Sequence, residues 1–519
     1  MRVSRRAFLR TAGAGAAALT VFDWERAALA QKKQVVTIAF PETITSMDPL
    51  IAPRNSPREA MYEAVFDRYL GQDRQLRYRP GIVEAWQWGA DKMTLDLKIR
   101  QGVRFHDGSD LSAEDVAFSM ERIKDGSIYK AIYGKVREFQ VKDKANLHLV
   151  FERFDPSFPR WMGFLASFTL PKAYFTKLGA DDKSRAEEFS RKPIGSGPYR
   201  VVSFTPGSTL VLEAFDGYWK GAPPIKRAVF KMVTDPTARV AEILSGNADI
   251  TSEVPVEEFA RLSGQPGLKG QRQAVADMAT LYVSPRFAPF QKEEVRLAVH
   301  HAIDKKTLVE KVLLGFGVPM SSTEGPLYDA HDESVTFAYD PARAKQLLQK
   351  AGYSTANPLQ LKAMTTKGAR AKDFELMTAI TQMWKDVGIE AELEIITIPQ
   401  WFSLRSARGE GGKDIAPLSL YFWSNASGDP VNSVGFQLNV KGPFRVWESP
   451  DMIPLIDPVF EEKDETKRVA AARRAAKYAV EKGYIIPLYQ VVQPIVLKKE
   501  LNYQGFPTGV LAPQEMTWA

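Results

Sequence analysis

Residues 193–221 begin Pro193-Ile-Gly-Ser-Gly-Pro-Tyr-Arg-Val-Val-Ser-Phe-Thr-Pro-Gly207 and, after a polar and apolar run, end Phe215-Asp-Gly-Tyr-Trp-Lys-Gly221. Gly195, Gly197 and Pro198 predict a sharp turn, because glycine adopts backbone conformations that other residues avoid and proline fixes its own. We expect the polypeptide to re-enter, at this turn, a sheet that it left earlier in the chain.

Two strands are predicted after the turn. The apolar run at 199–204 is typical of a buried strand. Leu210 and Leu212 then alternate with polar neighbours, and Asp216-Gly217 closes this second strand. Residues 199–217 are therefore predicted to form a hairpin.

This stretch resembles the "GTGPY … YW-G" signature of family 5 extracellular solute-binding proteins, the dipeptide and oligopeptide receptors of ABC importers. Four further stretches match that family in the expected order: Leu97-Lys-Ile-Arg-Gln-Gly-Val-Arg-Phe-His-Asp-Gly-Ser-Asp-Leu-Ser-Ala-Glu-Asp-Val-Ala-Phe-Ser119, Val295-Arg-Leu-Ala-Val-His-His-Ala-Ile-Asp304, Tyr339-Asp-Pro-Ala-Arg-Ala-Lys-Gln-Leu-Leu-Gln-Lys-Ala-Gly-Tyr353 and Tyr484-Ile-Ile-Pro-Leu-Tyr489. The resemblance implies an α/β, two-lobed periplasmic-binding-protein fold of type II, with mixed sheets flanked by helices and an extra inserted domain. It also implies a receptor for a small-molecule ligand that docks onto the permease subunits of an ABC transporter.

Local signals place several helices. Asp235-Pro236 and Asp340-Pro341 predict helix starts, because aspartate caps the first turn and proline fits its first position. Gly246 and Gly352 predict the ends of these helices. A third helix is expected at about 372–387, followed by an alternating strand.

The order of the elements predicts the domain organisation. Helix-then-strand units recur in two blocks, which indicates two α/β lobes. By resemblance, strands expected at 485–489 and 493–497 return to the first lobe, so the chain crosses between lobes more than once and encloses a ligand in the cleft. The expected parts are a signal peptide at 1–30, lobe I at 31–73, an inserted domain at 74–192, lobe I again at 193–284, lobe II at 285–486 and the last part of lobe I at 487–519.

The N-terminus has the features of a twin-arginine export signal. Arg5-Arg6 precedes a weakly apolar run at 11–22, and Ala28-Leu-Ala30 predicts cleavage after Ala30. The alternative is a membrane anchor, but about 12 apolar residues are too few where roughly 20 are needed, so no direct membrane insertion is expected. The chain has no cysteine, hence no disulfide and no lipid-modified cysteine. We therefore predict a freely diffusing protein in a Gram-negative periplasm.

Composition and charge limit the kinds of partner that the chain is expected to bind. The formal charge of the 519-residue chain is +7, and residues 1–30 carry five arginines and two acidic residues, so the rest is left at +4. These charges are interspersed along the sequence, which argues against nucleic-acid binding. We expect a monomer.

The sequence predicts neither a metal site nor a cofactor, and not an enzyme. His300 and His301 are adjacent, so on a helix they point about 100 degrees apart. His106 beside Asp107 has a metal-binding alternative, but its motif position favours a structural turn, and His148 is expected to face solvent. Ser127-Ile-Tyr-Lys130 is an S-x-x-K match without the K-T-G that accompanies it in penicillin-binding enzymes. An exported hydrolase stays as an alternative of another class.

The candidate ligand-binding residues lie in three stretches. The loop after the first strand contains Ser46 and Met47, which by resemblance face the cleft, although a plain connection explains them equally well. Lys367 and Arg370 fall where dipeptide-binding relatives place an anion-holding arginine; a solvated loop charge is the alternative. The third stretch supplies aromatic and polar side chains, with core packing as the alternative: Trp401, Trp423, Asn425 and Asp429.

The resemblance also bears on the ligand. Peptide-binding relatives hold the amino terminus of the peptide with an aspartate three residues after the tryptophan that corresponds to Trp423, since a buried ammonium group needs a charged partner. Here that position is Ala426, and Asp429, before Pro430, has the ordinary role of starting a turn. We expect a ligand without an ammonium group at this point, such as an oligosaccharide, an opine-like conjugate or an aromatic carboxylate. A di- or oligopeptide receptor is the alternative.

Overall fold

The computed structural model describes residues 34–50, 59–126, 130–164, 167–406, 417–440 and 449–519. The predicted export signal and Ser127 of the S-x-x-K match lie outside these ranges. Within them, every helix is too short or too polar to span a lipid bilayer.

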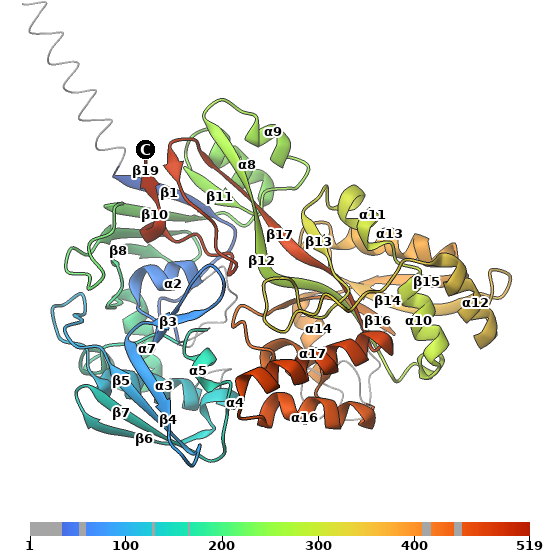
Figure 1. Cartoon of the computed structure of the whole chain (residues 1–519). Helices are drawn as coiled ribbons and strands as arrows, with labels where there is room; N and C mark the ends of the chain where they lie inside the picture. Colours follow the sequence, from blue (N-terminus) through green and yellow to red (C-terminus); the bar gives the residue numbers. More distant parts are fainter. Residues whose placement is uncertain (1–33, 51–58, 127–129, 165–166, 407–416, 441–448) are drawn as a thin grey trace, which may run out of the picture.

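An eleven-stranded mixed sheet runs through the molecule in the order β15-β14-β16-β12-β17-β11-β1-β10-β9-β8, with β13 paired to β17. Its strands are β1 (Val35–Phe40), β8 (Tyr199–Thr205), β9 (Thr209–Ala214), β10 (Arg227–Met232), β11 (Ile250–Ser252), β12 (Leu268–Val283), β13 (Gly317–Pro319), β14 (Leu359–Thr365), β15 (Ile389–Ile395), β16 (Leu418–Ser424) and β17 (Ile485–Lys498). Figure 1 shows the long strands β12 and β17 passing between the two lobes.

β12 and β17 pass from the core of one lobe to the core of the other at the point where their pairing is irregular. The ladder between β12 and β17 shifts register between Ala274 and Met278, and again after Ala279. Ala276 and Met278 pack in the core of the first lobe, whereas Ala279 and the apolar residues 281–283 that follow it pack in the core of the second. Such bulges bend a strand pair locally, so this is the natural place for the lobes to hinge.

The first lobe is formed by β1, β8–β11, the adjacent ends of β12 and β17, and short helices. These helices are α2 (Glu59–Val65), α8 (Pro236–Leu244) and α9 (Phe259–Ser263). The C-terminal segment adds β18 (Leu501–Asn502), the 3₁₀ turn η6 (Pro513–Glu515) and β19 (Thr517–Trp518). The indole nitrogen of Trp518 donates to the carbonyl of Val35 at the start of β1, which fixes the chain end to this lobe.

Between α2 and β8 lies an inserted region with its own four-stranded antiparallel sheet, β4-β5-β7-β6. Its elements are β2 (Leu70–Gln72), β3 (Tyr78–Pro80), β4 (Val83–Trp88), β5 (Thr94–Ile99), α3 (Ala113–Gly126), α4 (Lys130–Tyr133), β6 (Val136–Asp143), β7 (Asn146–Phe151), α5 (Phe158–Trp161), α6 (Lys172–Phe175) and α7 (Asp182–Arg191). Leu95 and Leu97 of this sheet share one hydrophobic core with Val36 and Ile38 of β1. The inserted region is thus packed onto the first lobe as one body.

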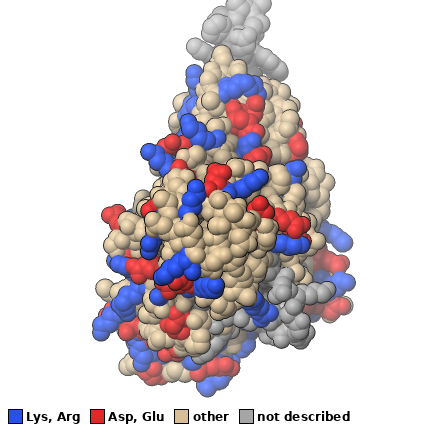
Figure 2. Space-filling view, turned by 90° about the vertical axis from the view of Figure 1, so that its right-hand side faces the viewer, with Lys and Arg blue, Asp and Glu red and all other residues tan. Residues whose placement is uncertain are grey.

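The second lobe surrounds β14, β15 and β16 and the adjoining ends of β12 and β17. Its helices and turns are η1 (Ala288–Gln291), α10 (Glu293–His301), α11 (Lys305–Thr307), η2 (Leu308–Val312), α12 (Pro341–Ala351), α13 (Asp373–Lys385), α14 (Ile398–Ser406), η4 (Val431–Gly435), α15 (Phe436–Leu438), η5 (Pro450–Met452), α16 (Ile453–Glu461) and α17 (Glu465–Glu481). On the face seen in Figure 2, basic and acidic side chains alternate and gather into no patch of one sign.

The hairpin β8–β9 is present, but two of its features differ from the prediction. β8 is the outermost strand of the sheet, and Tyr199 is its only buried residue, so it is an edge strand and not a buried one. Gly195 and Gly197 do not have positive φ angles. They are required instead for close packing, since a Cβ atom on Gly195 would collide with the carbonyl oxygen of Val65.

The Tyr-Trp pair of the signature has a structural role. The hydroxyl group of Tyr218 and the indole nitrogen of Trp219 each donate to a different carboxylate oxygen of Asp67, at 3.0 Å. Asp67 is buried directly after α2, so these bonds join the end of the hairpin to the start of the inserted region.

The strands predicted at 485–489 and 493–497 form the single strand β17. Gln490, the polar residue between them, does not interrupt it, because its buried amide donates to the carbonyl of Val275 on β12, at 2.9 Å. The return to the first lobe therefore happens inside β17. The predicted boundaries of the lobes and of the inserted domain stay predictions.

Candidate functional site

The segment that follows β16 lies at the junction of the two lobes, and we call Asn425–Pro430 the β16 loop. Trp423, just before it, is 8% exposed, and its indole nitrogen donates to the carbonyl of Asn432 at 2.5 Å. The backbone N–H of Asn425 donates to the carbonyl of Ala276 at 3.0 Å, at the bulge of the crossing strands. The side-chain amide of Asn425 donates to Ser433 at 3.1 Å. Both predicted residues thus lie beside the bulge of the crossing strands, and both are held by hydrogen bonds within the protein.

Asp429, in the same loop, is fully buried between two arginines. Its two carboxylate oxygens accept from the guanidinium of Arg468, each at 2.8 Å. The Nε atom of Arg160 lies 3.4 Å from the carboxylate. Burial alone would raise the pKa of Asp429, but the two arginines outweigh it and hold the pKa below its usual range. An ammonium group would have to displace one of these arginines in order to pair with Asp429.

Arg370 lies in the loop after β14 and belongs to a second, looser charge cluster. Its Nη2 atom lies 3.5 Å from the carboxylate of Asp277 on β12. Burial works against the charge, but Asp277, Glu253 and Glu42 raise the pKa of the guanidinium overall. The Nε atom of Arg370 has no hydrogen-bond partner among the described residues. Lys367, three residues earlier, is exposed above the ring of Phe374 and is not part of this cluster.

The two tryptophans do not form a shared platform. Trp401, in α14, is 2% exposed and stacks on Tyr421 of β16, with 3.8 Å between ring centroids. Tyr421 lies between Trp401 and Trp423, at 6.3 Å from the latter. Trp401 packs in the core of the second lobe, while Trp423 packs in the core of the first.

Ser46 and Met47 do not join these clusters. Met47 is fully buried in the first core, and its backbone N–H donates to Ser190 at 2.9 Å. Ser46 lines a groove of about 860 Å³ between the loop after β1 and the helices α3 and α7. The structure therefore separates this pair from Trp423, Asn425 and Asp429.

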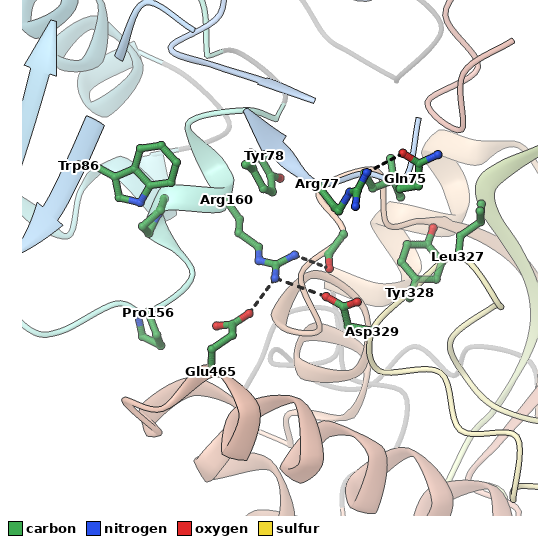
Figure 3. Close-up of a pocket in the computed structure, with 13 residues that line it drawn as sticks. Gln75, Arg77, Tyr78, Trp86, Pro156, Arg160, Leu327, Tyr328, Asp329 and Glu465 are labelled. Atoms are coloured by element: carbon green, nitrogen blue, oxygen red, sulfur yellow. Dashed lines mark hydrogen bonds and ion pairs between the residues drawn. The ribbon is translucent and has the colours of Figure 1, made fainter. Parts of the chain in front are cut away.

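A pocket between the inserted region and the second lobe was missed at the sequence level (Figure 3). It has a volume of about 350 Å³. The inserted region contributes Tyr78, Trp86 and Arg160, and the second lobe faces them with Asp329 and Glu465. These residues come from four separate stretches of the chain, and none of the five family motifs contains them.

Arg160 is the polar centre of this pocket. Its guanidinium lies 2.7 Å from Glu465 at the start of α17 and 3.8 Å from Asp329. It also donates to the carbonyl of Gly428 in the β16 loop at 3.0 Å. The side chain is only 20% exposed. Arg160 thus crosses from the inserted region to three points of the second lobe.

Glu324 is a second feature that the sequence did not reveal. It is fully buried, and its carboxyl group contacts the side chains of Ser433 and Asn425. Burial raises its pKa well above the usual value, and the negative charge of Asp429 adds to this. A neutral carboxylic acid next to Asn425 is the form that this environment favours.

His106, His148 and His300 contact other residues of the fold. His106 accepts from the N–H of Gly195 at 3.2 Å and contacts the carbonyl of Gly197 at 3.0 Å, and burial lowers its pKa to about 4. His148, predicted to face solvent, lies on the more exposed face of β7, where its side chain is 22% exposed and lies 2.6 Å from Asp96. His300 is buried against Phe337. Among the described residues there is no group of three or more His, Cys, Asp or Glu side chains placed to hold a metal ion.

Two lobes joined by crossing strands, with one mixed sheet that runs through both, define a type II periplasmic binding protein. Residues 77–441 match the model of the bacterial extracellular solute-binding proteins, family 5 (middle region), and the chain belongs to this family. This is a family of binding proteins, and it confirms both the resemblance and the predicted fold.

Relatives of known name are similar over most of the chain. Heme-binding protein A of Haemophilus influenzae is 26% identical over 68% of this chain and 67% of its own length. Di/tripeptide-binding protein 1 of Pseudomonas aeruginosa is 25% identical over 86% of this chain and 88% of its own length.

Solved structures share the fold at lower identity. The ABC transporter-associated periplasmic binding protein DppA from Helicobacter pylori, in complex with the peptide STSA, superposes with a TM-score of 0.77 at 18% identity, over 94% of this chain and 99% of that one. HbpA2 from Haemophilus parasuis gives a TM-score of 0.79 at 20% identity, over 93% and 100% of the two chains.

Proposed function

We propose that this protein captures a small solute between its lobes in the periplasm and delivers it to the permease of an ABC importer. The observation that carries the proposal is the membership of family 5 together with the bulge at which β12 and β17 pass between the cores. Export through the twin-arginine route, cleavage after Ala30 and action as a monomer belong to the same proposal.

The receptor proposal is tested by ligand-induced closure. Small-angle scattering and thermal shift with a broad metabolite panel should find at least one solute that both compacts and stabilises the protein. An exported hydrolase would instead convert a substrate, whereas a receptor returns its ligand unchanged. A panel that yields turnover and no compaction would therefore favour the hydrolase.

We further propose that the ligand is not an ordinary peptide with a free amino terminus. The proposal is supported by Ala426, which replaces the aspartate of the peptide-binding relatives and is 1% exposed, and by Asp429, which is neutralised by Arg468 and Arg160. An ammonium group at this point would be buried without a free partner, which costs several kcal/mol. The unused Nε atom of Arg370 supports a ligand with a polar or anionic group.

Two measurements test the ligand class. Native mass spectrometry of the purified protein should identify a co-purifying solute, and we expect an oligosaccharide, an opine-like conjugate or an aromatic carboxylate. Calorimetry with di- to pentapeptides should show no micromolar binding to the wild type. Binding of peptides that disappears on acetylation of their amino termini would overturn the proposal, whereas binding only to Ala426→Asp would support it.

A further inference from the structure

The carbonyl groups of the β16 loop are held from the inserted region. Three consecutive carbonyl oxygens, those of Ala426, Ser427 and Gly428, accept hydrogen bonds from side chains more than 260 residues earlier in the chain. The donors are Gln72 at 2.7 Å, Tyr78 at 2.5 Å and Arg160 at 3.0 Å. We call these three donors the latch.

The latch also has a charged and an apolar part. Arg160 forms ion pairs with Glu465 and Asp429 of the second lobe, as Figure 3 shows for Glu465. The next residue of α5, Trp161, stacks on Phe436 of α15, with ring centroids 6.0 Å apart and planes inclined by 25°. A single short helix of the inserted region thus contacts the β16 loop and the helices behind it.

The two sides of the latch belong to different bodies. The inserted region is joined to the first lobe at both of its ends and shares that lobe's core. Ala426 of the β16 loop packs in the first core, on the side where the latch meets it. The loop continues from β16 into η4 and α15, whose residues Val431, Val434 and Leu438 pack in the second core. The latch therefore exists only while the lobes are together, and opening at the hinge must break it.

The pocket described above lies directly beside the latch. Tyr78, Arg160 and Gly428 line that pocket together with Glu465 and Asp329. When the lobes separate, the loop carbonyls and the guanidinium can be hydrated, so the latch is reversible. Its strength then sets how much of the ligand-free protein is closed.

We propose that the inserted region serves as a latch on closure, in which Arg160 is the main positioning residue and Tyr78 and Gln72 add weaker hydrogen bonds. The β16 loop follows Trp423, so the latch also positions the stretch at which a ligand is gripped. This gives the inserted region a role in the open–closed equilibrium before any ligand binds. The inference concerns the ligand-free protein and does not depend on which solute is transported.

The experiment uses the absence of cysteine from the chain. Exposed Lys142, on β6, and exposed Lys345, on α12, are replaced by cysteine and spin-labelled, and double electron–electron resonance gives the distance distribution between the lobes. Arg160→Ala should lower the ratio of closed to open protein about tenfold, the loss expected for charged hydrogen bonds. Tyr78→Phe removes one hydroxyl group and should lower it about threefold.

The matched control is Arg77→Ala. Arg77 lines the same pocket, but it bonds to Asp73 and Gln75 of its own hairpin and to nothing in the second lobe among the described residues. It should leave the distribution unchanged, and Arg160→Lys should restore part of the closed population. An unchanged distribution in both Arg160→Ala and Tyr78→Phe, or equal opening in Arg77→Ala, would overturn the latch. If Arg160→Ala fails to fold, Tyr78→Phe alone decides.

Discussion

Two ion clusters lie at the junction of the lobes, and they differ in how completely their charges are satisfied. Asp429 and Arg468 expose no side-chain surface and meet through two hydrogen bonds of 2.8 Å. Arg370 and Asp277 are 35% and 20% exposed and lie 3.5 Å apart. The first cluster therefore has the properties of fixed architecture, whereas the second retains unused hydrogen-bonding capacity.

The backbone around the second cluster supports this difference. Glu253, which contributes to the charge around Arg370, has a φ angle of 54°, in the left-handed region that non-glycine residues rarely adopt. Burial raises the pKa of Glu253, and the carboxylates of Glu42 and Asp277 add to the rise. Backbone strain and buried negative charge of this kind are typical of functional sites, which supports the proposal that a ligand binds near Arg370.

The largest expected effect is the loss of Arg468. Arg468→Met leaves the carboxylate of Asp429 buried with only the more distant Arg160, so unfolding free energy should fall by about 3–5 kcal/mol. Urea denaturation at pH 7 measures it. Lys467→Met, one residue earlier on α17 and exposed, is the control and should change stability by less than about 0.5 kcal/mol. A loss for Arg468→Met as small as that of the control would show that the first cluster is not architectural.

The sequence predicted those parts of the fold that local chemistry determines. Asp235 and Asp340 cap α8 and α12 as expected, and Gly352 ends α12 with a φ angle of 95°. β17 was predicted as two strands, because the buried amide of Gln490 finds its partner on β12, more than 200 residues away. A sequence pattern shows that a residue is polar, but it does not show that a carbonyl group far away in the chain accepts its hydrogen bond.

The candidate site was less predictable for the same reason. Asp429 before Pro430 has the pattern of a turn, and nothing near it in sequence indicates Arg468 or Arg160. Arg160 precedes a tryptophan in a short helix without any family motif. Its role follows from the packing of the inserted region against the second lobe, which only the three-dimensional structure contains.

Acid should weaken the first cluster. The pKa of Asp429 in the folded protein lies below its unfolded value of about 3.9, so its ionised form stabilises the fold above about pH 4, and this contribution is lost as the pH falls through the folded pKa. The difference in unfolding free energy between the wild type and Asp429→Asn should shrink below pH 4 by up to about 1.4 kcal/mol per pH unit. A difference that stays constant from pH 7 to pH 2 would contradict the assignment.

The second cluster should respond to pH in the opposite direction. Because the pKa of Glu253 is raised, its protonated form suits the fold, and its contribution is present below the unfolded value of about 4.3 and lost as the pH rises through the folded pKa. Glu253→Gln removes the charge and should stabilise the protein at pH 7 by on the order of 1 kcal/mol, but not at pH 4. Glu257→Gln, at a carboxylate that pairs with Lys372 and whose pKa is lowered, should give no such gain.

The smallest effect on stability is expected from Arg370→Met. The guanidinium is a third exposed and its pair with Asp277 is long, so unfolding free energy at pH 7 should change by less than about 0.5–1 kcal/mol. Arg370 and Arg239 both lower the pKa of Glu253, so removal of Arg370 should enlarge the gain from Glu253→Gln and extend its rise to a higher pH. Urea denaturation of Arg370→Met with and without Glu253→Gln, between pH 4 and pH 8, measures both effects, and Lys367→Met is the control from the same loop. If Arg370→Met cost as much as Arg468→Met, the second cluster would be as architectural as the first, and Arg370 would have no freedom left to meet a ligand.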